Sequence, residues 1–162
     1  EVGEVGKNIR PCREWVRLFS DGMVPPEFLC INPLNGIECR TKDGKPSFRS
    51  DDNITSFRYI LVEWDSRPVE DQLRFYLSSK SKIKIDIITH SAGKSAHALV
   101  RIDAPDSKTW AASVRDLYKW LGPLGADASC KNPARLSRLP GGFRQGMGWQ
   151  RVIYINPEVV HV

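Results

Sequence analysis

The sequence predicts an α+β domain with a ferredoxin-like antiparallel sheet, and three observations support this. Apolar runs with β-branched and aromatic residues predict four strands, at residues 57–65, 83–87, 96–103 and 150–155. Apolar spacings of three and four residues predict two amphipathic helices, at 68–79 and 106–121. The order of strand, helix, strand, strand, helix, strand is typical of a split β–α–β sheet, with helices on one face and the other face free to hold a substrate.

The part of the chain before this pattern predicts smaller elements. We expect residues 1–52 to be the N-terminal part of the same domain. Residues 13–19 predict a short helix and residues 28–31 a strand, and the turn dipeptides at 35–36 and 43–44 predict small hairpins.

Length and charge narrow the class of protein. A chain of 162 residues, 41% of them hydrophobic, is long enough for one substantial core and too short for two comfortable domains. Its 24 Lys and Arg residues against 19 Asp and Glu give a net charge of +5, which favours a polyanionic partner. A basic chain with clustered carboxylates suggests a nucleic acid together with a metal ion.

The cysteines and the chain ends indicate the compartment. Cys12, Cys30, Cys39 and Cys130 contain no C-x-x-C pair, so we expect free thiols in a reducing cytoplasm. A structural zinc site using Cys30 and Cys39 is the alternative, although the usual close ligand spacing is absent. No apolar run is long enough for a membrane span, and no signal peptide is evident. The first residue is not Met, so we expect a piece of a longer chain.

Two carboxylates end the first predicted strand. Alternate side chains of a strand share a face, so Glu63 and Asp65 are expected to point the same way and to hold a divalent cation between them. The alternative is a solvated strand end beside the turn at 66–68.

The link between the second and third strands resembles a phosphate-binding turn. A P-loop needs a glycine where Ile88 stands and a helix afterwards, so Walker-type ATP binding is excluded. The turn at 91–95 can still offer backbone N–H groups and the Lys94 ammonium to a phosphate. His97 follows on the same strand face as Arg101, and it is either a phosphate ligand or a structural histidine.

A polar loop supplies further charge. Asp127 follows the second helix, and Arg135 and Arg138 precede a Pro–Gly pair. Guanidinium groups suit phosphate oxygens, and Asp127 would add a carboxylate. The alternative is a surface loop whose arginines pair with local acids.

Taken together, these motifs resemble the archaeo-eukaryotic primase superfamily, in particular the primase-polymerase domains of plasmid, phage and other mobile-element replication proteins. The resemblance covers roughly residues 53–157 and rests on Glu-x-Asp at 63–65, Ser-Ala-Gly-Lys-Ser-Ala-His at 91–97, Asp127, and Ala-Arg-Leu-Ser-Arg-Leu-Pro-Gly at 134–141. It implies a catalytic core over residues 53–162 with an RRM-like sheet.

The resemblance also implies roles for individual residues. The carboxylates would hold two Mg²⁺ or Mn²⁺ ions, and they are Glu63, Asp65 and Asp127. The residues expected to bind the nucleoside triphosphate are Ser91, Gly93, Lys94, Ser95, His97, Arg135 and Arg138. The implied substrates are a single-stranded DNA template with its primer, and a helicase domain is implied in the parent chain.

Two departures from the family pattern leave alternatives open. The first motif is Glu-x-Asp where many members have Asp-x-Asp, which should still coordinate a metal. Asp127 lies in no predicted strand, so Asp103 is the alternative third carboxylate.

Two other functions stay open. The alternative is a non-catalytic replication-initiator or DNA-binding module on the same fold. A rolling-circle nickase is a third option, but its paired metal-binding histidines are missing, because His90, His97 and His161 form no His-x-His pair.

Overall fold

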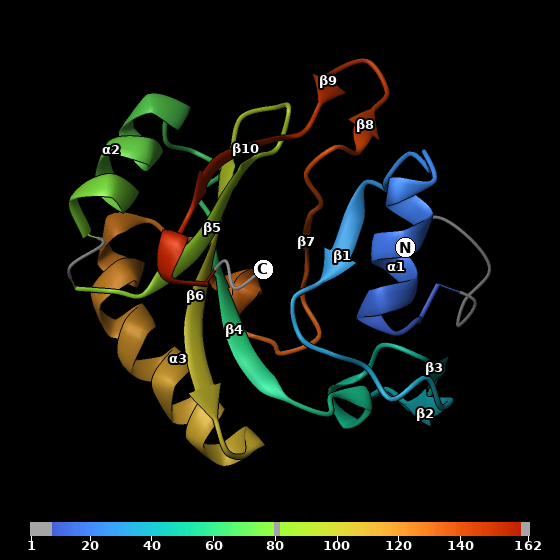
Figure 1. Cartoon of the computed structure of the whole chain (residues 1–162). Helices are drawn as coiled ribbons and strands as arrows, with labels where there is room; N and C mark the ends of the chain where they lie inside the picture. The colour runs from blue at the N-terminus through green and yellow to red at the C-terminus, as the bar shows by residue number, and fades with distance from the viewer. Residues whose placement is uncertain (1–7, 80–81, 160–162) are drawn as a thin grey trace.

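A central four-stranded antiparallel sheet organises the molecule (Figure 1). The computed structural model describes residues 8–79 and 82–159. The strand order is β10–β5–β6–β4, where β4 is Phe57–Val62, β5 is Ile85–His90, β6 is Ala96–Ala104 and β10 is Arg151–Ile155. The helix predicted at 68–79 joins β4 to β5, and β6 lies between these two strands in the sheet. The predicted split β–α–β unit and the α+β class are therefore confirmed.

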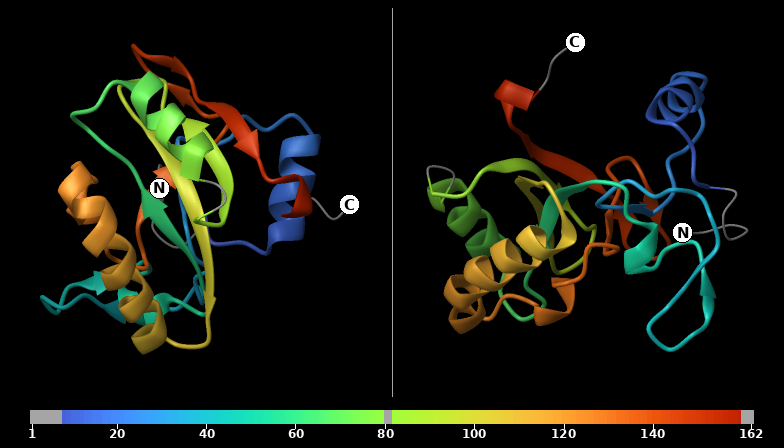
Figure 2. Two further views of the ribbon diagram at one scale, coloured as in Figure 1. Left: turned by 90° about the vertical axis from the view of Figure 1, so that its left-hand side faces the viewer. Right: turned by 90° about the horizontal axis from the view of Figure 1, so that it is seen from below.

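Helices α2 (Val69–Ser79) and α3 (Ser107–Leu121) cover one face of this sheet (Figure 2). Both were predicted from apolar spacing, and the predicted start of α3 is confirmed because the Asp106 carboxylate caps it by accepting the Thr109 N–H at 2.7 Å. Leu77 is one of the apolar residues whose spacing predicted α2, and its expected place on the buried face was wrong, because it is 48% exposed. The buried face of α2 is rotated and includes Gln72 and Tyr76.

The core lies between the helices and the sheet. A group of aromatic and aliphatic side chains fills it, including Ile60, Val62, Trp64, Tyr76, Ile88, Trp110, Val114, Tyr118 and Leu121. The strand predicted at 57–65 ends at Val62, because the next backbone groups find partners outside the sheet. The Trp64 carbonyl accepts a hydrogen bond from the Gln72 side chain at 3.0 Å.

The opposite face of the sheet is partly enclosed by a second layer. After α3 the chain crosses this face, and β7 (Leu136–Arg138) pairs there with β1 (Phe28–Cys30) in an antiparallel ribbon. A short hairpin of β8 (Phe143–Arg144) and β9 (Gly148–Trp149) follows before the chain enters β10. No strand was predicted between residues 125 and 148. The pairing of β7 with β1 joins distant segments and leaves no local pattern in the sequence, and β8 and β9 have only two residues each.

The N-terminal elements pack outside this ribbon, on the side away from α2 and α3 (Figure 2). Helix α1 (Cys12–Ser20) buries no residue and stacks Trp15 on Phe19 at 5.5 Å. Strands β2 (Cys39–Arg40) and β3 (Pro46–Ser47) form the predicted hairpin around Asp43–Gly44. The other predicted hairpin, at Asn35–Gly36, is wrong: Leu34 forms an isolated bridge with Ile54 instead.

The four cysteines are free thiols, as predicted. Within residues 8–79 and 82–159, the group of three donors that could hold a metal ion includes neither Cys30 nor Cys39, so the zinc alternative finds no support there. Over the same ranges no helix has both the length and the apolar content that a membrane crossing requires.

Candidate active site

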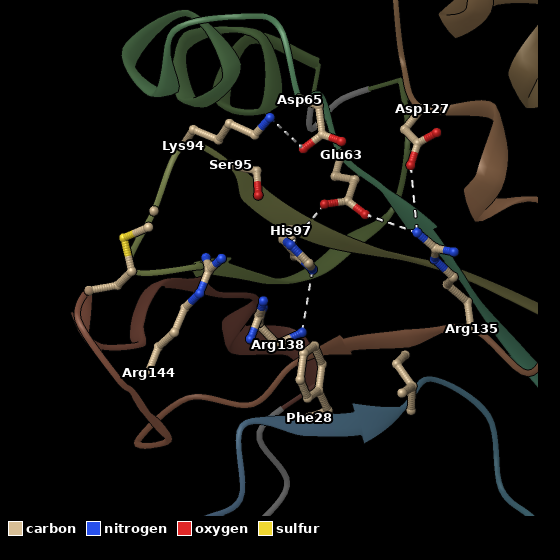
Figure 3. A pocket seen from close by; sticks show the side chains of 13 residues that line it. Phe28, Glu63, Asp65, Lys94, Ser95, His97, Asp127, Arg135, Arg138 and Arg144 are labelled. Atoms are coloured by element: carbon tan, nitrogen blue, oxygen red, sulfur yellow. Dashed lines mark hydrogen bonds and ion pairs between the residues drawn. The ribbon is translucent and has the colours of Figure 1, made fainter. Parts of the chain in front are cut away.

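A cavity of about 520 Å³ lies between the sheet and the β1–β7 ribbon (Figure 3). Its charged lining residues are Glu63, Asp65, Lys94, Asp127, Arg135, Arg138 and Arg144, and its other polar lining includes Ser95 and His97. Nine of the ten residues predicted for the site line it, Gly93 among them. The tenth, Ser91, is 1% exposed and bonds Ser95 within the turn, with their hydroxyl oxygens 3.2 Å apart.

Glu63 and His97 form the buried floor of the cavity. Glu63 directly follows β4 and His97 is the second residue of β6, and both lie on the face opposite the helices. His97 Nε2 lies 2.9 Å from Glu63 Oε2. The Arg138 backbone N–H reaches His97 Nδ1 at 3.3 Å. Because a backbone N–H can only donate, Nδ1 accepts and the ring proton on Nε2 faces Glu63.

Glu63 keeps its negative charge despite being buried. Burial alone would raise its pKa. The hydrogen bond from His97 opposes this, as do the Cys130 thiol and Arg135, and together they lower the pKa of Glu63 to about 2. The carboxylate is therefore ionised at every pH at which the protein would work.

Asp127 is brought to Glu63 by the main chain. Its backbone N–H donates to the Glu63 carbonyl at 2.9 Å, which fastens the segment after α3 to the end of β4. Its side chain caps the short 3-10 helix Ala128–Cys130 by accepting the Ser129 N–H at 2.9 Å. The alternative carboxylate, Asp103, does not line the cavity and lies beside Arg101, with Oδ2 3.8 Å from Arg101 Nη1.

Cys130 joins this pair, and sequence reasoning missed it. Its thiol donates to Glu63 Oε1 at 3.3 Å, and its sulfur lies 3.8 Å from Asp127 Oδ2. Burial, followed by the charge of Glu63, raises the pKa of Cys130, so the sulfur is held as a thiol. A single cysteine without a spaced partner gives no signal in a sequence.

The cavity also contains a cationic side chain between two of its carboxylates, and a third carboxylate at its rim. Arg135 Nη2 is 3.6 Å from both Glu63 Oε1 and Asp127 Oδ2, which places its positive charge between the two acids. Asp65 is mostly exposed and pairs with Lys94, whose Nζ is 3.7 Å from Asp65 Oδ1. Glu63 and Asp65 both line the cavity, but they contact different partners (Figure 3).

The donor set suits a divalent cation. Among the described residues, one oxygen or sulfur atom each from Glu63, Asp127 and Cys130 lies within 4.8 Å of the others, and Asp65 is not part of that group. The carboxylate oxygens are ligands that Mg²⁺ and Mn²⁺ accept. Asp65, at the rim, could bind a cation that also contacts a ligand in the cavity.

The opposite wall is positively charged. A Cβ atom at Gly93 would come within 2.7 Å of Arg144 Nη1, so the glycine allows this guanidinium to lie against the 91–95 turn. Within the described ranges no carboxylate lies at ion-pair distance from Arg144, whereas Arg138 Nη1 pairs with Glu27 at 2.8 Å. Burial, and then the charge of Arg144, lower the pKa of Arg138. An anion bound between these arginines would relieve that repulsion.

Gln72 links the segment that carries Glu63 and Asp65 to the 91–95 turn. This role was not predicted from the sequence. The Gln72 side-chain amide donates to the carbonyls of Trp64 at 3.0 Å and Lys94 at 3.1 Å, and its oxygen accepts the Ala96 N–H at 2.8 Å. Gln72 thus positions the carboxylate segment relative to the 91–95 turn. Its signal in the sequence was a polar residue on the inner face of an otherwise amphipathic helix.

The comparisons with known proteins agree with this architecture. No protein-family model and no curated protein sequence matches the chain. Among solved structures, the chain is similar to the AEP domain of the primase-polymerase of cyanophage S-2L, with a TM-score of 0.52 and 25% sequence identity. The match covers 67% of this chain and 57% of the phage domain. The chain has the fold of an archaeo-eukaryotic primase-polymerase domain.

Proposed function

We propose that this chain is a metal-dependent nucleotidyltransferase that synthesises or extends primers on single-stranded DNA. The observation that carries the proposal is the division of one cavity into two walls. Carboxylates lie on one wall, at Glu63, Asp65 and Asp127, and cationic side chains lie on the other, at Arg138 and Arg144. Nucleotidyl transfer needs both, because it joins a hydroxyl group to a triphosphate that carries several negative charges.

The cationic wall would bind the triphosphate. Arg144 has no carboxylate partner in the described ranges and can offer a bidentate contact to phosphate oxygens. Lys94 would add a point charge on release from the exposed Asp65. His97 acts through Glu63 in this arrangement, since its Nε2–H bond holds the carboxylate toward the cavity.

The carboxylate wall would hold the cations. Glu63 and Asp127 converge there, and Asp65 would contact a second ion or a metal-bound phosphate at the rim. When bound, two divalent cations lower the pKa of the attacking 3′-hydroxyl and stabilise the leaving pyrophosphate. Arg135 would then move from the acids toward the phosphates, which its partial exposure permits.

The β8–β9 hairpin offers a surface for the template strand. Phe143 and Trp149 are about half exposed, and their rings pack edge to face at 5.0 Å. Arg144 and Met147, from the same hairpin, line the cavity. Exposed aromatic rings beside arginines bind single strands by stacking with bases and by attraction to the backbone, with little sequence preference. Such a template would belong to a replicating phage, plasmid or mobile element.

Primer extension on single-stranded DNA, with Mg²⁺ or Mn²⁺, tests the proposal. We expect Asp65→Ala to lose synthesis and to keep single-strand binding, because Asp65 contacts no part of the core. Asp116→Ala, an exposed acid on α3, is the matched control and should extend primers as the parent does. Equal extension by the Asp65→Ala variant would contradict the assignment of Asp65.

One observation favours the alternative, a non-catalytic DNA-binding module on the same fold. Each carboxylate of the cavity already has a cationic or hydrogen-bonding partner in the protein: Glu63 has His97, and Asp65 has Lys94. Calorimetric titration with a nucleotide and Mn²⁺ separates the two functions. A binding module would show neither nucleotide binding nor synthesis at any metal concentration, while still binding single-stranded DNA.

A further inference from the structure

A second cavity, of about 490 Å³, lies between helix α1 and the β1–β7 ribbon. Its aromatic lining residues are Trp15 and Phe19 of α1 and Phe28 of β1. Helix α1 lies beside β1 and buries none of its residues (Figure 1). Its aromatic side chains therefore border a hollow instead of completing a packed core. A cavity of this volume can enclose most of a small organic molecule.

The lining of the second cavity favours a flat molecule with a negative charge. Trp15 and Phe19 are one helical turn apart, and their stacked rings have centroids 5.5 Å apart. Among the described residues that line the cavity, the charged ones are Arg10 and Arg49, and none is a carboxylate. The Arg10 guanidinium lies 5.7 Å from the centre of the Trp15 ring and also pairs with Glu14. Aromatic rings beside arginines bind nucleobases by stacking and phosphates by charge.

The second cavity shares a wall with the candidate active site. Phe28 and Leu136, one from each strand of the ribbon, line both cavities. The Arg138 guanidinium, which lines the candidate active site, lies 4.0 Å from the centre of the Phe28 ring (Figure 3). A molecule in the second cavity would therefore contact the ring against which Arg138 rests.

We propose that the second cavity binds a nucleoside phosphate, and that the bound molecule restrains Arg138 through Phe28. The base would stack on Trp15, and the phosphate would lie against Arg10 and Arg49. A ligand that fills the space beside Phe28 restricts the ring, and the guanidinium that packs on the ring is then restricted too. This site is separate from the one that the proposed function uses, so it needs neither a divalent cation nor a template.

Calorimetric titration with AMP in the presence of EDTA is the first measurement. We expect the parent to bind AMP, to bind adenosine at least about tenfold more weakly, and not to bind ribose 5-phosphate. Trp15→Ala should weaken AMP binding at least about tenfold through lost stacking. Val16→Ala, at an exposed position of the same helix, is the matched control and should bind AMP as the parent does. Because α1 buries no residue, both variants are expected to fold.

The second measurement follows Arg138 by NMR of nitrogen-15-labelled protein. Its Nε–H signal is sensitive to the ring current of Phe28, because the guanidinium and the ring are in contact. AMP should shift this signal in the parent and in Val16→Ala, and it should not do so in Trp15→Ala. The signal is assigned by its loss in Arg138→Lys.

The proposal is overturned if the parent does not bind AMP, if Trp15→Ala binds it equally well, or if AMP leaves the Arg138 signal unmoved. It is also overturned if a single-stranded oligonucleotide binds through Trp15 and AMP does not, because the cavity would then belong to the template path. Should Trp15→Ala fail to fold, Phe19→Leu must weaken AMP binding in its place. AMP binding without primer synthesis would contradict the proposed function alone, and synthesis without AMP binding would contradict this inference alone.

Discussion

The face of the sheet opposite the helices carries a buried charge cluster at each end of the β4–β6 pair. At one end Glu63 meets His97, and at the other Tyr59 lies opposite Arg101. Leu61 faces Leu99 between them. Two similar pairs of polar residues thus stand at the two ends of these strands. Glu63 and His97 line the cavity of about 520 Å³, and Tyr59 and Arg101 do not line it.

The far cluster does not line the cavity, although Asp86 Oδ1 is buried there without a hydrogen-bond partner among the described residues. Asp86 is fully buried, and its Oδ2 accepts from Arg101 Nε at 2.5 Å and from the Tyr59 hydroxyl at 3.1 Å. Burial is the main cause that raises the pKa of Tyr59, and hydrogen bonds to Tyr59 and Asp86 raise the pKa of Arg101. These groups neutralise one another. The Arg101–Asp86 ion pair therefore has a structural role.

The near cluster differs because it is incomplete. Glu63 has His97 and Arg135 as partners, yet Asp127 and Cys130 add further donors, and the cavity allows ions to enter. The comparison shows that a buried ion pair by itself does not identify a ligand-binding site. Several charged groups beside open space indicate a site, because a ligand can reach them there.

The largest expected effect is at the near cluster. Glu63→Gln keeps the shape of the side chain and removes its charge, so primer synthesis should fall by about 1000-fold. Thermal unfolding should change little, since the amide oxygen can still accept from His97. Primer synthesis and thermal unfolding are both measured on the same preparation of the Glu63→Gln variant. Full activity in this variant would place the reaction elsewhere.

Arg101→Met tests the far cluster. It leaves Asp86 buried without its cation, which should lower the free energy of unfolding by about 3 kcal/mol and the melting temperature by about 10 °C. Differential scanning calorimetry measures the loss. Adding Asp86→Asn should recover much of it, and a melting temperature unchanged by Arg101→Met would show that this cluster contributes little.

Arg135→Gln should have opposite effects on two ligands. Removing the cation 3.6 Å from both acids should raise the affinity for Mn²⁺ in the absence of nucleotide by about tenfold. The affinity for the nucleotide should fall. Mn²⁺ binding is followed by electron paramagnetic resonance, with Arg74→Gln on α2 as the control for an exposed arginine. Weaker Mn²⁺ binding would mean that Arg135 supports the metal site.

The smallest expected effect is at the hairpin next to the near cluster. Trp149→Ala should weaken binding of single-stranded DNA about fivefold, which corresponds to about 1 kcal/mol of lost stacking. Fluorescence anisotropy with a labelled oligonucleotide measures it. Trp120→Ala removes an exposed tryptophan from α3 and should leave the affinity unchanged. Equal losses in both variants would remove the hairpin from the template path.

Local periodicity explains which parts could be predicted. The alternation in β6 placed His97 and Arg101 on one face, and the spacing of Trp110, Val114 and Leu121 defined the buried side of α3. Each pattern repeats within a single element. The site residues near the ends of these elements could therefore be expected to converge, before any distance was known.

Gln72, Cys130 and Arg144 could not be predicted in the same way. Cys130 meets Glu63 across 67 positions of the chain, and the pairing of Phe28 with Arg138 spans an even longer separation. Nothing near Cys130 or Arg144 in the sequence marks such contacts, whereas Gln72 could be noticed only as a polar residue on the inner face of α2. The roles of Cys130 and Arg144 follow from the crossing of the open face by the segment after α3.

By itself the sequence determined the order of the strands and helices and the chemical types gathered at the ends of β4 and β6, because side-chain periodicity is a property of neighbouring residues. Tertiary structure alone decided which carboxylates share a cation, that Asp65 pairs with Lys94, and that a sulfur atom joins Glu63 and Asp127. The physical reason is the range of the forces. Backbone geometry is set locally, whereas the balance of buried charge depends on every group that packing brings within a few ångströms.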